Sequence, residues 1–250
     1  MRRRPYLLDA DPQAPFPPAA LALREPDGLL AVGGDLSPPR LLAAYRGGIF
    51  PWYSEGQPIL WWSPDPRAVF RTDAVHLATR FRRQLRASRW ILRADTRFAD
   101  VMAACARAPR HGQSGTWITP DMMAAYARLH ALGHAHSVEV FDGERLVGGI
   151  YGVAVGRMFF GESMFSAVAG GSKAALAGLA GYLAARGWPL IDAQVENPHL
   201  LRMGAERWPR DAFMARIAPL VGHVGNVGAW TNDFGERTAA SLGVSAGGAA

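Results

Sequence analysis

The stretch HSVEVFDGERLVGGIYGVAVGRMFFGESMF, residues 136–165, decides the fold. It contains three strand-like runs separated by turn signals at Asp142–Gly143 and at Gly156, and runs joined in this way form an antiparallel meander. The helical pattern SKAALAGLAGYLAAR, residues 172–186, follows and leads into the strand LIDAQVE, residues 190–196. The region is therefore predicted to be of the α/β (α+β) class, a mixed sheet with flanking helices and a helical crossover within the sheet.

The rest of the chain divides near residue 66. Residues 1–66 are rich in proline and glycine and predict a small N-terminal α+β domain, in which the aromatic segment 48–66 is too broken by proline for a central strand. Residues 67–235 show a cleaner alternation of elements and predict the larger domain. Helices are expected there over residues 74–87, 96–107 and 120–132. Residues 236–250 have little apolar bulk and predict a disordered tail.

Composition excludes several classes of protein. The single cysteine, Cys105, rules out an internal disulfide framework and leaves no partner for a thiolate zinc site. No run approaches the roughly 18 apolar residues of a membrane span, and the first residues lack the apolar core of a signal peptide. We therefore expect a soluble, cytoplasmic protein.

Positive charge is concentrated in RFRRQLRASRWILR, residues 80–93, which contains no acid, in a chain of net charge +6. Like charges at helical spacing repel one another unless a polyanion is near, so contact with phosphates is favoured over a merely solvated helix face. The predicted nucleic-acid contacts are Arg80, Arg82, Arg83, Arg86 and Arg89.

Three polar residues lie inside the apolar strand patterns. Strict alternation places Glu162 and Met164 on one face of their strand. On the next strand it places Asp192 and Gln194 on one face, about 7 Å from each other. Because one helix links the two strands, they are expected to lie close together. Two carboxylates and an amide facing a cleft would suit a cationic or amine substrate. The competing interpretation is a polar outer face of the sheet.

A resemblance to a known family rests on a series of sequence blocks. In chain order they are REPDGLLAVGGDLSPPRLLAAYRGGIFPWYSEGQPILWWSPDPRAVF, GTWIT, AYARLHALGHAHSVEV, LVGGIYGV, FFGESMFS, SKAAL and LIDAQVENPHL. Between about Phe16 and Phe213 the chain resembles the leucyl/phenylalanyl-tRNA–protein transferases. The resemblance implies a cytoplasmic enzyme that moves leucine or phenylalanine from aminoacyl-tRNA to the N-terminal Arg or Lys of a protein and so creates an N-degron. An apolar donor pocket is expected to accept Met as well, and the protein is expected to be a monomer. The resemblance also implies a catalytic domain similar to the GNAT acetyltransferases, and no cofactor, because the aminoacyl ester is already activated.

The same resemblance assigns roles to individual residues. Asp192 and Gln194 match the family's catalytic strand motif, and the sequence leaves open whether Asp192 is a general base or orients the amine. Glu162 would help to hold the amine and the terminal adenosine, which Trp52 and Trp117 would flank. The remaining substrate-binding positions, most of them in the pocket for the donor side chain, are Ile150, Phe159, Met164, Leu179, Leu183, Ile191 and Asn197.

Three other interpretations are weaker. An acetyltransferase that uses coenzyme A needs a glycine-rich pyrophosphate loop, which SAVAGGSK, residues 166–173, does not supply. A noncatalytic RNA-binding module would explain the arginines but leaves the acids and the amide without a role. A metal site at His130, His134 and His136 has no acid to complete it, and Gly133 breaks the helix between the first two, so no metal is expected.

Overall fold

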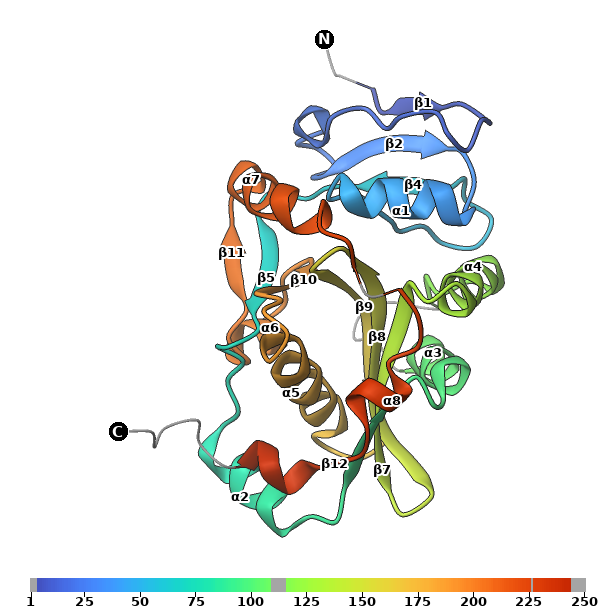
Figure 1. Ribbon diagram of the computed structural model, residues 1–250. Coiled ribbons are helices and arrows are strands. Elements are labelled where there is room, and N and C mark those ends of the chain that lie inside the picture. Colours follow the sequence, from blue (N-terminus) through green and yellow to red (C-terminus); the bar gives the residue numbers. More distant parts are fainter. Residues whose placement is uncertain (1–3, 109–115, 226, 244–250) are drawn as a thin grey trace.

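The computed structural model describes residues 4–108, 116–225 and 227–243 and shows a small sheet set on top of a larger one (Figure 1). The small sheet has four strands in the order β1-β2-β4-β3. Its elements are β1 (Tyr6–Leu8), a 3-10 helix η1 (Ala19–Leu21), β2 (Leu29–Gly33), α1 (Pro38–Arg46), β3 (Phe50–Pro51) and β4 (Leu60–Trp62). The prediction of no central strand within 48–66 is wrong, because the proline-free β4 pairs with β2 on one side and β3 on the other.

The large sheet has eight strands in the order β11-β5-β10-β9-β8-β7-β6-β12. The strands are β5 (Arg67–Arg71), β6 (Ile91–Ala94), β7 (Ala135–Asp142), β8 (Arg145–Val155), β9 (Met158–Ser166), β10 (Leu190–Gln194), β11 (Glu206–Trp208) and β12 (Arg237–Thr238). Neighbouring strands are antiparallel except β9 and β10, which are parallel. The predicted meander is present as β7, β8 and β9, and α5 (Gly171–Ala184) connects it to β10. The predicted mixed α/β class is therefore confirmed.

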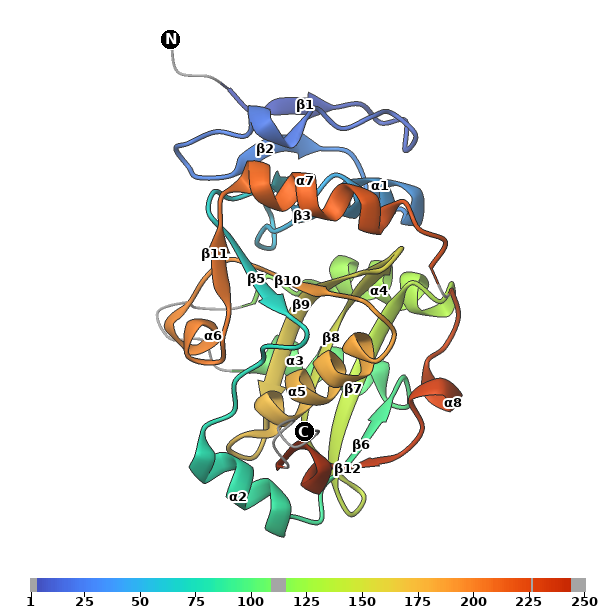
Figure 2. The ribbon, with the colours of Figure 1, turned by 60° about the vertical axis from the view of Figure 1, so that its left-hand side comes forward.

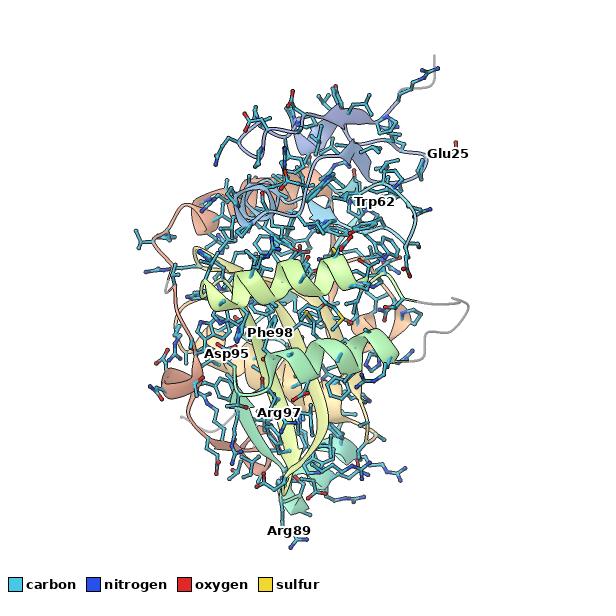
Figure 3. All side chains as sticks on the ribbon, turned by 90° about the vertical axis from the view of Figure 1, so that its right-hand side faces the viewer. Glu25, Trp62, Arg89, Asp95, Arg97 and Phe98 are labelled. Atoms are coloured by element: carbon cyan, nitrogen blue, oxygen red, sulfur yellow. The ribbon has the colours of Figure 1, made fainter. Side chains whose placement is uncertain are left out.

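Helices cover both faces of the large sheet. α3 (Phe98–Arg107) and α4 (Pro120–Ala131) lie on one face, and α5 lies on the other (Figures 2 and 3). α2 (Thr79–Ala87) lies at the end of the molecule farthest from the small sheet. The other helices are α6 (Pro198–Arg202), α7 (Arg210–Val221), α8 (Thr231–Phe234) and the 3-10 helix η2 (Ala239–Gly243). In the part of the chain that the structure describes, no helix is long and apolar enough to cross a membrane.

One buried core joins the two sheets. It contains Tyr45 of α1 and Trp61 of β4 together with Tyr126 of α4 and Phe213 of α7. A second core lies between the large sheet and α5. The small sheet is thus packed firmly onto the large one, and a domain boundary near residue 66 stays a prediction.

The strands β9 and β10 part soon after they pair. Their register joins Phe159 to Ile191 and Phe160 to Asp192 and goes no further along these two described strands. Beyond that point β9 continues along β8, while β10 continues along β5. Gly161 stands where they separate, and a Cβ there would come within 3.2 Å of the Asp192 carbonyl oxygen. The opening between the strands positions the candidate site.

A bulge in β9 overturns the predicted alternation. The register between β8 and β9 skips Glu162, which is the extra residue of the bulge. Phe160 before it and Phe165 after it both face the core shared with α3 and α4, whereas Met164 packs in the core beneath α5. The prediction that Glu162 and Met164 share a face is therefore wrong, because period 2 fails where one residue is inserted.

The disordered tail predicted from residue 236 is wrong for its first part. The strand β12 pairs with Ile91 and Leu92 of β6, and η2 contacts α2. Ala239 is fully buried. Small residues suffice here because the edge of the sheet supplies backbone hydrogen bonds. The rest of the predicted tail, 244–250, lies outside the described residues.

Candidate active site

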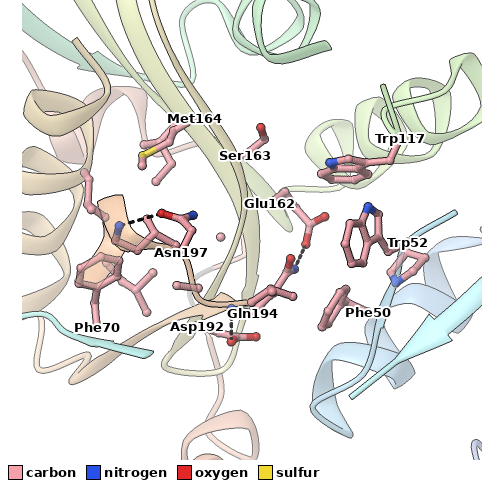
Figure 4. A pocket seen from close by; sticks show the side chains of 18 residues that line it. Phe50, Trp52, Phe70, Trp117, Glu162, Ser163, Met164, Asp192, Gln194 and Asn197 are labelled. Carbon is pink, nitrogen blue, oxygen red and sulfur yellow. Dashed lines mark hydrogen bonds between the residues drawn. The ribbon is translucent and has the colours of Figure 1, made fainter. Parts of the chain in front are cut away.

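A cavity of about 330 Å³ opens where β9 and β10 part (Figure 4), a size typical of small-ligand sites. It is lined by Phe50, Pro51, Trp52, Phe70, Trp117, Ile150, Gly161, Glu162, Ser163, Met164, Leu176, Ile191, Asp192, Ala193, Gln194, Val195, Asn197 and Leu200. The lining therefore combines the small sheet, both parting strands and the start of α6. Glu162 and Gln194 lie beside aromatic side chains on one side of it, and Met164 and Phe70 lie on the other (Figure 4).

Glu162 is held by hydrogen bonds from three elements. Its Oε1 accepts from the Tyr45 hydroxyl and from Gln194 Nε2, each at 2.7 Å, and its Oε2 accepts from the Tyr126 hydroxyl at 2.9 Å. Burial raises the pKa of Glu162 to about 7; the three hydrogen bonds oppose this rise, and the charge of Asp192 adds to it. Glu162 can therefore gain or lose a proton near neutral pH.

Gln194 has an uncommon backbone conformation. A bulge at Ala193 separates Asp192 from Gln194, and Gln194 has φ 61°, in the left-handed region. A non-glycine residue there costs of order 1–3 kcal/mol, and such residues concentrate at functional sites. The Gln194 backbone N–H donates to Asp192 Oδ1 at 2.9 Å while its side chain reaches Glu162. Gln194 thus links the two carboxylates and points its amide at the cavity (Figure 4).

Asp192 is neutralised by a buried arginine. Arg67 donates from Nε to Oδ1 at 2.8 Å and from Nη2 to Oδ2 at 2.6 Å, and both side chains are fully buried. The guanidinium of Arg67 lies between the rings of Phe50 and Phe213, 4.8 Å from each centroid. Glu162, Asp192 and Gln194 thus meet at one cavity as predicted, but both oxygens of Asp192 are already bound by Arg67, which the prediction did not include. Of the two acids, Glu162 alone has a carboxylate without an ionic partner among the described residues.

Two tryptophans stand on the same side of the cavity. Trp52 and Trp117 are half-buried and lie together beside Glu162 and Gln194 (Figure 4). Trp52 is fixed because Trp62 Nε1 donates to its carbonyl oxygen at 2.7 Å. Flat aromatic surfaces next to polar groups suit a stacked base or a similar flat group.

The other side of the cavity is apolar. Ile150, Met164 and Ile191 line it as predicted, together with Phe70 and Leu176, which were not predicted. The structure does not bring the other three predicted pocket residues to the wall. Phe159, Leu179 and Leu183 are fully buried in the core beneath α5. The resemblance assigned all six positions to the pocket and did not separate the residues of the wall from those one layer behind it.

Asn197 has a structural role as well as a place in the lining. Its Oδ1 accepts from the Leu200 backbone N–H at 2.9 Å and so caps α6. Both residues line the cavity. The cap thus fixes the start of α6 against the apolar side.

The predicted arginines lie far from this cavity. α2 occupies the end of the molecule opposite the small sheet, whereas the cavity adjoins that sheet (Figures 1 and 4). Arg80, Arg83, Arg86 and Arg89 are exposed, while Arg82 is half-buried and donates to the Leu77 carbonyl oxygen at 2.9 Å. A ligand that touched both places would have to span the large sheet.

The predicted histidines have structural partners, and His130 and His136 share one of them, Asp95, at 4.0 and 2.8 Å. The His136 ring lies 2.8 Å from Asp95 Oδ2 and stacks on Trp230, and the His130 ring stacks on Phe98. No group of three or more His, Cys, Asp or Glu side chains that could hold a metal ion occurs within the described ranges.

Sequence reasoning missed Arg67, Tyr45 and Tyr126. A buried aspartate requires a cation, so Asp192 implied that some arginine should lie near it, but nothing in the sequence pointed to position 67. The two tyrosines occupy apolar positions of ordinary amphipathic helices, and no local pattern marks them as partners of Glu162.

An opening in a mixed sheet with two tryptophans on one side, and an amide and a titratable carboxyl beside them, is suited to a group-transfer enzyme. Comparison with known proteins agrees. The family model described as leucyl/phenylalanyl-tRNA protein transferase matches residues 69–218, and the model for the N-terminal domain of that transferase matches residues 34–65. The chain belongs to the leucyl/phenylalanyl-tRNA–protein transferase family, and it is a transferase.

Individual relatives match along nearly the whole chain. The leucyl/phenylalanyl-tRNA–protein transferase of Xanthomonas axonopodis pv. citri is 66% identical over 242 residues, which are 97% of this chain and 97% of the relative. The protein of the same name from Xylella fastidiosa is 63% identical over 242 residues, which are 97% of this chain and 100% of the relative.

Proposed function

We propose that this protein transfers leucine or phenylalanine, and also methionine, from the 3′ end of an aminoacyl-tRNA to the N-terminal Arg or Lys of an acceptor protein. The acceptor α-amine attacks the aminoacyl ester, and a peptide bond replaces the bond to the tRNA. The product is an N-degron. A cytoplasmic location and a monomeric state belong to the same proposal.

The position of Gln194 carries this proposal. Its Nε2 is engaged by Glu162 and its backbone N–H by Asp192. These two bonds fix the amide and leave its Oε1 as the acceptor that faces the ligand. A carbonyl oxygen fixed in this way can accept a hydrogen bond from an attacking amine and orient its lone pair, which lowers the barrier by positioning. Asp192 then orients rather than removes protons, because Arg67 already binds both its oxygens.

The walls suit the two parts of the donor. We assign the terminal adenosine to Trp52 and Trp117, and the donor side chain to the apolar side formed by Ile150, Met164 and Ile191. Phe159, Leu179 and Leu183 then support that wall from behind. An apolar pocket distinguishes side chains that differ by one methylene by only about 1–3 kcal/mol, which is consistent with several unbranched or aromatic donors.

The arginines of α2 are proposed to contact the tRNA away from its 3′ end. Arg80, Arg83, Arg86 and Arg89 form no salt bridge within the described part of the chain. Their distance from the cavity fits a macromolecular donor that crosses the large sheet, and a free aminoacyl ester would not reach them.

Label transfer tests the function directly. The protein is incubated with radiolabelled Leu-tRNA and a model protein that begins with Arg, without ATP. We expect label in the protein, and a matched acceptor that begins with an acetylated residue should stay unlabelled. Absence of label together with acetyl transfer from acetyl coenzyme A would favour an acetyltransferase, and tRNA binding without either reaction would favour an RNA-binding module.

A further inference from the structure

Three side chains, Tyr45, Tyr126 and Glu162, form a closed ring of hydrogen bonds beside the cavity. Tyr45 Oη lies 2.7 Å from Glu162 Oε1, Tyr126 Oη lies 2.9 Å from Glu162 Oε2, and the two phenol oxygens are hydrogen-bonded to each other. Both tyrosines are fully buried, and Glu162 is 8% exposed. The ring joins α1, α4 and β9, so it also connects the small sheet to the large one.

The number of protons decides how this ring can be bonded. It has three links, and each link needs one proton, but Tyr45 and Tyr126 bring only one each. When Glu162 is ionised, both phenol protons point to the carboxylate and the link between the phenols has none. When Glu162 is a carboxylic acid, its own proton is the third and every link is filled. The ring is therefore built to accept one proton.

We propose that Glu162, with Tyr45 and Tyr126 as its positioning residues, is the proton acceptor of the transfer reaction; this rests on the function proposed above. The acceptor enters as an α-ammonium group and gives one proton to the Glu162 carboxylate, which leaves a neutral amine and a carboxylic acid. The amine nitrogen then bonds to the ester carbonyl carbon. The bond from that carbon to the 3′ oxygen breaks, and a second N–H proton ends on this oxygen. Glu162 returns its proton to solvent.

The acidities of the groups match this task. A peptide α-amino group has a pKa of about 7.7–8.0, and burial raises the pKa of Glu162 to about 7, so the proton transfer is nearly balanced. Burial, followed by the nearby charge of Glu162, raises the pKa of Tyr45 and of Tyr126 well above the usual value for a phenol. The phenols therefore keep their protons throughout.

The neighbouring groups leave Glu162 as the best placed acceptor. Tyr151 on β8 faces the two ring tyrosines, and Asp192 on β10 faces Glu162. Asp192 is occupied, because Arg67 of β5 donates to both its oxygens. Glu162 borders the cavity and carries no such ion pair among the described residues.

The first test uses Glu162→Gln, which keeps the shape of the side chain and can still bond to both tyrosines but cannot take up a proton. Single-turnover transfer is measured from pH 5.5 to 9 with saturating Leu-tRNA. We expect wild type to lose rate below pH about 7, and the variant to be slower by roughly 10²-fold at neutral pH, the usual size of a general-base contribution. Saturating Leu-tRNA keeps any change in its Kd out of the measured rate.

A chemically altered acceptor separates proton removal from mere support of the site. A peptide whose terminal amine is replaced by an aminooxy group is unprotonated at neutral pH and has no extra proton to give. We expect Glu162→Gln to transfer to this peptide at nearly the wild-type rate. An equal loss with both acceptors, or an unchanged pH profile in the variant, would overturn the proposal while leaving label transfer by wild type, and so the proposed function, intact.

The tyrosines are tested by Tyr45→Phe and Tyr126→Phe. Each removes a hydrogen bond that stabilises the ionised carboxylate, so the acid limb of the pH profile should move to higher pH. Tyr182→Phe is the matched control, since Tyr182 is a buried tyrosine that donates to another carboxylate, Asp233, at 2.9 Å. A carboxylic-acid infrared band that is lost in Glu162→Gln and titrates near pH 7 should accompany these shifts. Its absence at pH 6 in folded wild type would contradict the proposal.

Discussion

The buried ion pair of Arg67 and Asp192 allows the effect of a substitution on stability to be separated from its effect on activity. Asp192→Ala removes three hydrogen bonds, two from Arg67 at 2.8 and 2.6 Å and one from the Gln194 backbone N–H at 2.9 Å. It leaves a guanidinium that is fully buried, and whose Nη1 already has no hydrogen-bond partner among the residues that the structure describes. Phe50 and Phe213 lie against the charge, so the loss of the carboxylate leaves the guanidinium beside apolar rings.

The magnitude follows from the uncompensated charge. Removing one member of a buried ion pair costs about 3–5 kcal/mol, and for a chain of this length each kcal/mol lowers Tm by about 2–4 °C. We therefore expect Asp192→Ala to lower Tm by roughly 6–20 °C. The double variant Arg67→Met/Asp192→Leu removes both charges and fills the space, so its free energy of unfolding should return to within about 1 kcal/mol of wild type.

Urea unfolding followed by tryptophan fluorescence measures the free energies, and single-turnover label transfer measures activity on the same samples. Both variants should stay slow in transfer, because each lacks the oxygen that holds Gln194, while binding of Leu-tRNA should be almost unchanged. A loss below about 1 kcal/mol in Asp192→Ala, or a double variant no more stable than the single one, would refute the view that buried charge sets this cost.

Three further predictions concern other parts of the molecule. Burial raises the pKa of Glu139 from 4.5 to about 7, so between these pH values the folded state binds a proton that the unfolded state has lost. The free energy of unfolding of wild type should therefore fall as pH rises from 4.5 to 7. Urea unfolding at several pH values should show a smaller fall in Glu139→Gln. Trp52→Ala and Trp117→Ala should each weaken binding of an aminoacyl-adenosine by about 1–3 kcal/mol, the stacking of one base, and calorimetry that finds no loss would remove that tryptophan from the site. Replacing Arg80, Arg83 and Arg86 by alanine should lower tRNA affinity and reduce the slope of log K against log salt by about 2–3, whereas a triple variant of the exposed Arg128, Arg145 and Arg157 should keep the wild-type slope.

The sequence predicted the elements whose signals are local. The meander β7–β9 and the helices α4 and α5 all depend on residues close to one another in the chain. In α4, for example, the structure shows Thr119 capping the first turn by accepting from the Met122 N–H. The predicted start of α2 at residue 74 is wrong, because α2 begins at Thr79 and a distant part of the chain decides the conformation before it. Residues 74–78 could continue the helical pattern, but the His76 N–H bonds to the Met203 carbonyl oxygen, a partner 127 positions along the chain.

In the candidate site, too, the identity of the residues was predictable from local patterns, whereas their orientation and pairing were not. Glu162, Asp192 and Gln194 were predicted because polar residues inside strand patterns are conspicuous, and the structure does bring them together. Their state was not predictable. Two bulges decide where Glu162 and Gln194 point, and a bulge arises from the fit of two strands to each other. The pairing of Asp192 with Arg67 joins strands that are distant in the chain, and only the assembled sheet reveals it.

The enclosure of Arg67 has a consequence for biosynthesis. When this residue leaves the ribosome, Phe50 has already been made, but Asp192 is 125 positions away and Phe213 is later still. The guanidinium must therefore stay in water until most of the polypeptide has emerged. Until then β5, the strand that carries it, cannot be buried in the core. A chain stalled before β10 would have the aromatic residues of the small sheet in place and no Asp192 to pair with the charge beside them, so the core that encloses Arg67 can form only after β10 has been made.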